Sequence, residues 1–282
     1  MKKPTYPIGF LSVFAQSFGR ILTTWLILIV ENILIALIPL FIGLSIDGLL
    51  EGSVVSIVWL GSILALLGSV AVARRIYDTR VYGGLRVRLG MDVHGRVSQL
   101  DHSAMTARLD MSRELIDFLE LELPDLMTAV IQVGVSLVVL SAFDLYLGVS
   151  CLLVIAAMVG FYGLFHRRFY SLNGTLNTQQ EYQVRALKTG IRGVLFKHLK
   201  ALRQTEIALS DTEAFVYGGI FVLQIGFILF NLYWGTTITG ATAGQIFAII
   251  AYSWDYVEAA LAIPIAMQSW SRLSEIISRL NR

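Results

Sequence analysis

All 22 Lys and Arg residues of this chain fall into four clusters, and the long apolar stretches between the clusters contain no basic residue. The clusters occupy residues 1–20, 74–113, 167–203 and 272–282. Membrane proteins keep Lys and Arg in their cytoplasmic loops, so an even number of crossings separates each cluster from the next. Two crossings per gap predict six transmembrane helices, with both termini in the cytoplasm.

The composition agrees with a membrane protein, since 56% of the 282 residues are hydrophobic and the net charge is only +2. A soluble domain of this length does not need so much apolar surface. The placement of the basic residues already has a topological explanation, so nucleic-acid binding is not indicated. Cys151, the single cysteine, lies in an apolar run and can form no disulfide within one chain.

A crossing needs about 20 apolar residues, and six stretches of about that length can be found. They cover approximately residues 21–46, 54–73, 123–141, 145–165, 214–234 and 245–267. Residues 1–20 precede them and mix aromatic and aliphatic residues with Ser, Gln and Gly, which predicts an N-terminal interfacial (elbow) helix. The alternative is an unstructured tail with an early start of the first crossing. Residues 21–282 form the membrane domain.

Two of the connections are too long for plain loops. A helix that runs from residue 54 to residue 100 would be about 70 Å long at 1.5 Å per residue, roughly twice the hydrocarbon thickness. Its lower half would project into the cytoplasm, and a turn near residues 101–110 would send the chain back. Four glycines in this half indicate close helix packing or local bending: Gly83, Gly84, Gly90 and Gly95. Residues 170–213 predict a second cytoplasmic hairpin.

The fold class expected is therefore an all-α membrane protein with six transmembrane helices and two cytoplasmic helical extensions. The pattern is typical of a multi-pass protein of a bacterial-type inner (plasma) membrane. The lipid bilayer is its first partner.

Three acidic residues lie inside the apolar stretches: Glu31 near the middle of the first, and Asp255 and Glu258 in the sixth. Asp255 and Glu258 are three residues apart and share a helix face. A charge at the bilayer centre costs at least about 2.5–3.5 kcal/mol. No Lys or Arg lies within these stretches, so we do not expect a buried salt bridge. We expect instead a proton carrier or a cation site.

The alternative is that the three acids only line a wet vestibule, hydrogen-bonded to Gln224, Asn231 or Gln245. Tyr252 and its aromatic neighbours Trp254, Tyr256 and Trp270 suit a cationic or amphipathic substrate through cation–π contact, although such residues also anchor helices at interfaces. The candidate cavity, proton or substrate site therefore consists of six residues: Glu31, Gln224, Asn231, Tyr252, Asp255 and Glu258.

Other kinds of site are not indicated. The four histidines lie in the predicted cytoplasmic parts, and no pair has the close spacing of a zinc site. No Ser/His/Asp or Cys/His arrangement emerges, so we expect no catalytic residue and no metal. The chain contains no GxxxxGK[ST] loop, so it holds no nucleotide in the P-loop manner and no other cofactor is implied.

Several segments resemble the transmembrane domain of ABC exporters, in the order and spacing of that family. They are LIPLFIGLSIDGLL (37–50), LRVRLGMDVHGRVSQLD (85–101), RALKTGIRGVLF (185–196), the stretch from WGTTITG to LAIP (234–264) and WSRLSEIISRL (270–280). The resemblance implies two cytoplasmic hairpins that carry coupling helices, and a last segment that leads toward an ATPase domain. Here both hairpins look several residues shorter than is usual, and no nucleotide-binding domain follows within the sequence.

The resemblance implies a transport protein that works as a homodimer by alternating access and moves a small molecule, a peptide or an amphipathic solute. One version takes ATP hydrolysis from a separate ATPase chain, as the wider family does. The other is ATP-independent and proton-coupled, which the deep acids favour. A third hypothesis is a non-transporting membrane assembly partner that keeps the fold. The sequence names neither the substrate nor the direction of transport.

Overall fold

The computed structural model describes residues 17–97, 102–188, 190–238 and 240–280, and within them the chain is helical with no β-strand. The elements are α2 (Phe18–Leu50), α3 (Val55–Val97), α4 (His102–Asp117), the π-helix η1 (Phe118–Glu122), α5 (Leu123–Phe143), α6 (Leu145–Lys188), α7 (Arg192–Thr237) and α8 (Ala243–Leu280). The all-α prediction is confirmed. The interfacial helix predicted within residues 1–20 lies outside the described residues up to position 16, and Phe18 already belongs to α2.

Five stretches of the described chain are long and apolar enough to cross a membrane. They are Phe18–Leu50, Val55–Gly95, Leu109–Phe143, Leu145–Leu176 and Arg192–Thr237. Each contains one of the first five predicted crossings. Helix α8 carries Asp255 and Glu258 in its apolar part and is not among the five. The sixth crossing stays a prediction.

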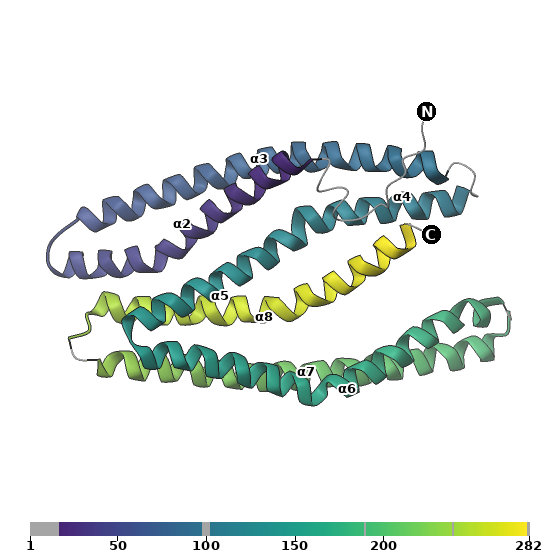
Figure 1. Cartoon of the computed structure of the whole chain (residues 1–282). Coiled ribbons are helices and arrows are strands. Elements are labelled where there is room, and N and C mark those ends of the chain that lie inside the picture. The colour runs from purple at the N-terminus through teal and green to yellow at the C-terminus, as the bar shows by residue number, and fades with distance from the viewer. Residues whose placement is uncertain (1–16, 98–101, 189, 239, 281–282) are drawn as a thin grey trace. The chain divides into compact units, whose positions relative to one another are not determined.

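The chain divides into two compact units. The first unit holds residues 1–144 and 234–282 and therefore contains α2, α3, α4, η1, α5 and α8. In it α2 and α3 form a hairpin, α5 packs along α8, and α2 packs against both (Figure 1). The second unit holds residues 145–233, in which α6 and α7 form one long antiparallel hairpin (Figure 1).

Helix α3 confirms the predicted long helix, since its 43 residues give a length of about 65 Å; the cytoplasmic position of its second half, which we call the projection, stays a prediction. The two halves of α3 differ in burial. No residue of its most apolar stretch is buried, whereas Tyr82, Leu89 and Val93 in its second half are buried. The expectation of close packing at its four glycines is wrong. A Cβ added to any of them would meet open space.

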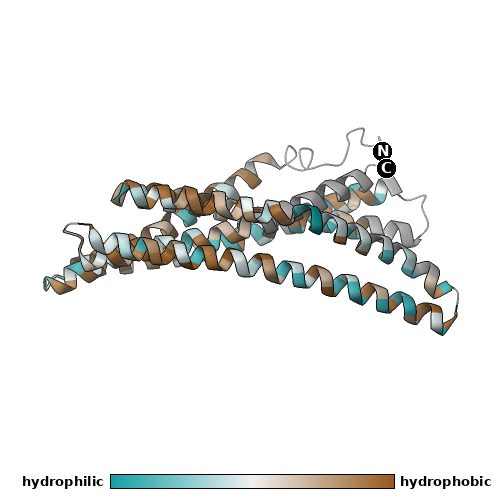
Figure 2. Ribbon diagram, turned by 90° about the horizontal axis from the view of Figure 1, so that it is seen from below, coloured by the Kyte–Doolittle hydropathy of each residue, from teal (hydrophilic) through white to brown (hydrophobic). Residues whose placement is uncertain are grey.

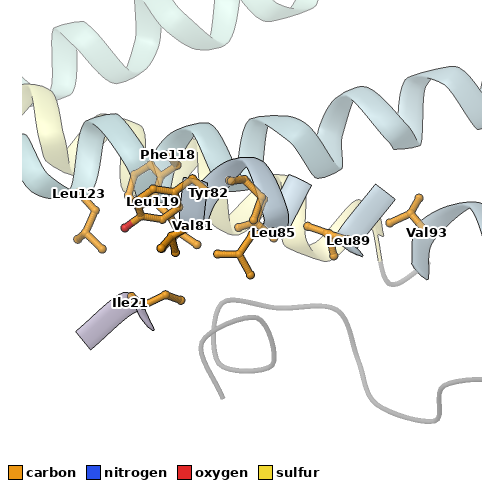
Figure 3. Packing of buried hydrophobic residues seen from close by; sticks show 11 residues of the cluster. Ile21, Val81, Tyr82, Leu85, Leu89, Val93, Phe118, Leu119 and Leu123 are labelled. Atoms are coloured by element: carbon orange, nitrogen blue, oxygen red, sulfur yellow. The ribbon is translucent and has the colours of Figure 1, made fainter. Parts of the chain in front are cut away.

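The core of the first unit lies around the projection of α3 (Figure 3). It joins Ile21 of α2 to five residues of α3 and to residues of α4, η1 and α5; the buried cluster is Ile21, Val81, Tyr82, Leu85, Leu89, Val93, Leu115, Ile116, Phe118, Leu119 and Leu123. At roughly 1.5–3 kcal/mol for each buried large apolar side chain, this cluster anchors α3 to the α4–α5 segment.

Three turns contain a glycine with positive φ: Gly52, Gly190 and, before α8, Gly240. Gly52 (φ +80°) follows α2, and the N–H of Ser53 donates to the Gly48 carbonyl at 2.7 Å, which closes the helix in the Schellman manner. Gly190 (φ +64°) closes the α6–α7 hairpin. Polar residues gather toward that turn (Figure 2), as predicted for a second cytoplasmic extension. The turn predicted at residues 101–110 is wrong in extent, because α4 is already helical from His102.

Helix α8 begins with a capping box at Thr242 and Gln245. The N–H of Gln245 donates to Thr242 Oγ1 and the N–H of Thr242 donates to Gln245 Oε1, both at 3.2 Å. Asp47 at the end of α2 completes the cap, since its carboxylate accepts the Gly244 N–H at 2.8 Å and the Thr242 hydroxyl at 2.6 Å. Gln245 therefore serves the helix start, which differs from the vestibule role considered for it.

The same end of the first unit has a close backbone approach between α2 and α8. A Cβ on Gly43 or on Gly244 would collide with the backbone carbonyl of the other. Glycine at both positions lets the two helices touch, as small residues do in membrane helix packing. We call this contact, with Asp47, Thr242 and Gln245, the external clamp, and the opposite end of the first unit the cytoplasmic end; both names follow the topology that the basic clusters predict.

Candidate functional site

A charged cluster lies where α2, α3 and η1 meet. The guanidinium of Arg74 on α3 donates to both carboxylate oxygens of Glu31 on α2, and its Nη1 lies 3.4 Å from Asp78 Oδ2 one turn further along α3. Glu31 and Asp78 are buried, at 9% and 4% exposure. One guanidinium is therefore shared by two buried carboxylates, so each buried charge has an ion-pair partner.

The expectation that Glu31 has no basic partner is wrong. Glu31 precedes Asp47 by 16 residues, so it lies about 24 Å along α2 from the external clamp. Glu31 thus lies level with the point on α3 where the apolar residues end and the basic residues begin, away from the middle of the apolar stretch. Arg74, which follows the last apolar residues of α3, reaches it there. The length of α2 could have indicated this position. Its 33 residues are more than one crossing of about 20 residues needs, so a residue near the middle of the helix need not lie at the middle of the membrane.

A second ion-pair group adjoins the first. Arg86 of α3 donates to Asp117 Oδ1 and Glu120 Oε2, with Nη2–oxygen distances of 2.5 Å to each. Glu120 lies in η1, a single π-helical segment between α4 and α5 that continues both helices without a break. π-Segments inside α-helices are frequent at functional sites. This one sets the register in which Glu120 faces α3.

The two ion-pair groups border a cavity of about 200 Å³. Its polar lining comes from α3, η1 and α5 and consists of Arg74, Arg75, Asp78, Glu120, Asp125 and Thr128. Leu28, Leu121 and Pro124 add an apolar side. We call this cavity the charged pocket. It lies wholly within the first unit.

Asp78 is the most buried acid of the charged pocket, on the part of α3 beyond the membrane crossing. Burial raises its pKa above the ordinary value of 3.8, while the neighbouring Thr24 hydroxyl and the charge of Arg74 lower it. Its Oδ1 is buried and meets no donor with hydrogen-bonding geometry among the described residues. A buried carboxylate oxygen of this kind costs free energy until something donates to it.

The predicted acids of α8 lie on a different part of the first unit. Tyr252 is 1% exposed and its hydroxyl donates to the Ala36 carbonyl of α2 at 2.6 Å. This bond lies next to Pro39, which has no N–H to offer within α2. Tyr252 thus ties α8 to α2. Asp255 is half-buried, and Glu258 is exposed.

Trp254 is also exposed, at 58%, whereas Tyr256 is buried. Asp255 and Glu258 therefore share one side of α8 with Trp254, and the tyrosines face the helices packed against α8. The side chain of Trp270 lies outside the described residues.

Gln224 and Asn231, the other two predicted site residues, lie on α7 in the second unit. Asn231 is fully buried and its Oδ1 accepts a hydrogen bond from Ser150 of α6 at 2.7 Å. Gln224 is 2% exposed, and its Nε2 donates no hydrogen bond among the described residues. A cavity of about 370 Å³ between α6 and α7 has an almost wholly apolar lining that includes neither residue.

Within the described residues no three His, Cys, Asp or Glu side chains come together in a way that would hold a metal ion. Cys151 is buried in α6.

Long apolar helices that continue into charged hairpins define an all-α, multi-pass membrane protein. The family described as "ABC transporter transmembrane region" matches residues 13–244. The chain belongs to this family, and it is the membrane-spanning part of an ABC-type transporter. The comparison with curated proteins found no match.

Proposed function

We propose that two copies of this chain form a membrane transporter of six-span halves, whose ATPase is a separate chain. The family match and the five membrane-length helices support the membrane-spanning role. The 282 residues contain no GxxxxGK[ST] loop, and ATP hydrolysis by a separate ATPase chain is the version of the family that we propose here. The cytoplasmic ends of α3, α4, α6 and α7 are the surfaces on which an ATPase docks. We place both termini in the cytoplasm of a bacterial-type inner membrane.

The observation that carries this proposal is the acidic side of α8. Glu258 is exposed and Asp255 half-buried in the apolar part of the helix. A carboxylate facing lipid at this depth costs at least about 2.5–3.5 kcal/mol. The acidic side of α8 therefore faces a water-filled cavity, which one six-span half does not enclose alone. A second copy supplies the other wall.

The chemistry of that side favours a cationic or amphipathic solute. Two carboxylates attract positive charge, and exposed Trp254 offers an aromatic face for a cation–π contact, worth about 0.5–2 kcal/mol. Tyr252 supports this side indirectly, because its bond to Ala36 fixes the rotation of α8.

A second candidate function is favoured by the same acids. Two carboxylates three residues apart on one helix suit proton binding, so a transporter of this fold that runs on the proton gradient and needs no ATPase is the alternative. The two candidates differ in their energy source and share the cavity.

The test is flux of the cationic dye ethidium into proteoliposomes that contain the protein with its co-purified partners. ATP should drive the flux. Asp255→Asn with Glu258→Gln should reduce it about tenfold or more, because interactions with charged groups contribute about 1.5–3 kcal/mol each. Glu51→Gln, an exposed acid in the loop after α2, is the matched control and should leave flux unchanged.

Three results would decide between the candidates. Flux that follows a pH gradient without ATP would replace the ATPase version by the proton-coupled one. Flux that the double variant leaves unchanged would remove α8 from the pathway. No flux of any solute, with a stably assembled complex, would contradict the transport function itself.

A further inference from the structure

The apolar cavity of the second unit has no part in the proposed transport pathway. Its volume is about 370 Å³, and its lining runs from Tyr146 to Ala157 on α6 and from Leu223 to Phe230 on α7. We call it the apolar groove. We propose that it binds one acyl chain of a membrane lipid, in the leaflet on the side of the connection before α6. This inference does not depend on the transport proposal.

The groove is open to what surrounds the α6–α7 hairpin. Tyr146, Leu153 and Phe230 line it, and all three side chains are exposed, so a ligand can reach the lining. Both helices contain stretches long and apolar enough to cross a membrane. The molecules next to the groove are therefore lipids. A groove left empty would forfeit van der Waals contacts along its whole lining, which favours filling it.

The length of the groove matches one leaflet of a bilayer. Tyr146 and Ala157 are 11 residues apart, which corresponds to about 16 Å along α6 at 1.5 Å per residue. Half of a hydrocarbon core about 30 Å thick is about 15 Å. On α7 the lining covers residues 223–230, in the second half of the predicted crossing 214–234. The groove therefore begins near the membrane surface and ends near the middle of the bilayer, as one acyl chain does.

Aromatic residues mark the outer end of the groove. Tyr146 is the second residue of α6 and lines the groove there. On α7, Tyr233 and Trp234 follow Phe230 by about one turn, and Trp234 Nε1 donates to Asp144, the residue before α6, at 2.9 Å. Tyr and Trp are enriched where a membrane meets water. The outer end of the groove thus lies at the level of the lipid headgroups.

The lining offers a ligand little besides apolar surface. Ser150 lines the groove, but its hydroxyl already contacts Asn231 Oδ1 and the Leu147 carbonyl, both at 2.7 Å. The predicted crossings 145–165 and 214–234 contain no charged residue. Neither an ammonium nor a phosphate finds a counter-ion here. A hydrocarbon chain fits this lining better than the cationic solute proposed for α8, and the chain is recognised whatever headgroup it carries.

A bound chain has a consequence for the hairpin. Membrane helices associate through packing, because lipid tails are as apolar as the helices themselves. A chain in the groove contacts Leu153 of α6 and Phe227 of α7 at once, whereas a chain beside a single helix contacts one convex surface. The groove therefore retains its chain longer than the rest of the hairpin does, and the chain joins the two helices.

The experiment is photolabelling of the full-length protein in phosphatidylcholine vesicles. The probe is a phosphatidylcholine with a diazirine in the middle of one acyl chain, and mass spectrometry locates its adducts. Labelling of Leu153 and Phe227 should saturate as the fraction of probe rises, because one chain fills the groove. Val222 is exposed on α7 and does not line the groove. Its labelling should rise in proportion to the probe, as contact with bulk lipid does.

Two adjacent variants locate the chain. Ala157 lines the inner end of the groove, and Ala156 is exposed on the same helix outside the lining. Ala157→Phe places a ring in the volume of the chain and should lower labelling of Leu153 about fivefold, because the chain loses its contacts there. Ala156→Phe adds the same ring elsewhere and should leave labelling unchanged. Ala157→Leu, with a smaller side chain, repeats the test if Ala157→Phe does not fold.

The headgroup supplies a further check. A phosphatidylglycerol that carries the same diazirine chain should label Leu153 as strongly as the phosphatidylcholine probe, because no basic residue lies in either predicted crossing. Markedly stronger labelling by the anionic lipid would mean that the headgroup is recognised, which contradicts recognition of the chain.

The proposal is wrong if labelling of Leu153 rises in proportion to the probe, as at Val222, since that is contact with bulk lipid only. It is also wrong if correctly folded Ala157→Phe is labelled like the wild type. A groove without lipid adducts, with a disulfide between two copies that carry Leu153→Cys in a Cys151→Ala background, would show that a second copy covers it. None of these outcomes involves flux or ATP, so the transport proposal is tested separately.

Discussion

The two ends of the first unit are held together by different interactions. At the external clamp, Gly43 and Gly244 bring two backbones into contact, and Asp47 caps α8. At the cytoplasmic end, Arg74 and Arg86 hold four carboxylates around a cavity. Backbone contact has one geometry, whereas ion pairs respond to protonation, ligands and partners. We infer that the external end is the fixed end and that the cytoplasmic end is the responsive one.

The largest expected effect comes from removing the central guanidinium of the cytoplasmic end. Arg74→Met leaves Glu31 and Asp78 buried without a cation and should cost about 3 kcal/mol of unfolding free energy, the lower part of the range for breaking a buried pair. Arg75→Met is the matched control, because Arg75 is adjacent and exposed, and it should change stability by less than about 0.5 kcal/mol. Chemical unfolding in detergent measures both.

A double variant checks the cause of that loss. Adding Glu31→Gln to Arg74→Met should restore part of the lost stability, because it removes one of the unpaired charges. If the double variant is as unstable as the sum of the two single variants, the ion pair is not the reason.

The next effect is at the external clamp. Gly43→Ala or Gly244→Ala places a methyl group against a backbone carbonyl, so the helices have to separate, and overpacking of this kind costs about 1–3 kcal/mol. Gly61→Ala on α3, where a Cβ meets open space, should be neutral or stabilising. Equal melting temperatures of the three variants would contradict the close backbone approach of α2 and α8.

A smaller effect tests the cap. Asp47→Asn removes the charge that accepts the Gly244 N–H and the Thr242 hydroxyl, and should cost about 1 kcal/mol, as the loss of an N-terminal cap does. Glu51→Gln, an exposed acid directly after α2, serves as the comparison. If the two variants have the same melting temperature, the cap by Asp47 does not contribute to stability.

The smallest effect is a pH dependence at Asp78. Burial raises the pKa of this carboxyl in the folded protein, so the folded state binds the proton more tightly than the unfolded state. The contribution of Asp78 to stability is therefore full below its unfolded pKa, near 3.8, and is lost as the pH rises through the higher folded pKa. Relative to Asp78→Asn, the wild type should gain stability as the pH falls through that window. A constant difference would contradict the shift.

Much of the fold could be predicted from the sequence, because clusters of basic residues and apolar length report topology directly. The projection of α3, the second hairpin and the turn before Leu145 follow from them, and the structure confirms these elements. The cap of α8 was readable in principle from the Thr-x-x-Gln spacing at Thr242.

The charged pocket could not be predicted, because it depends on depth and register. The sequence predicts Arg74 in a cytoplasmic cluster and Glu31 near the middle of the membrane. The two residues lie at the same height only because α2 is longer than one crossing. Glu120 faces α3 through a π-helical segment that no sequence pattern marks. The acids of α8 were found because a charge in an apolar run stands out, whatever its partners.

The most direct test of a fixed external end and a responsive cytoplasmic end is a pair of spin-label distances in a Cys151→Ala background. Labels at Thr79 and Glu122 report on the cytoplasmic end, and labels at Leu50 and Phe247 report on the external end; all four residues are exposed. When Arg74→Met is introduced, the Thr79–Glu122 distance should shift or broaden by about 2 Å, the scale of helix movements in switching proteins, while the Leu50–Phe247 distance stays the same. Equal changes at both ends, or a change at the external end alone, would contradict the division.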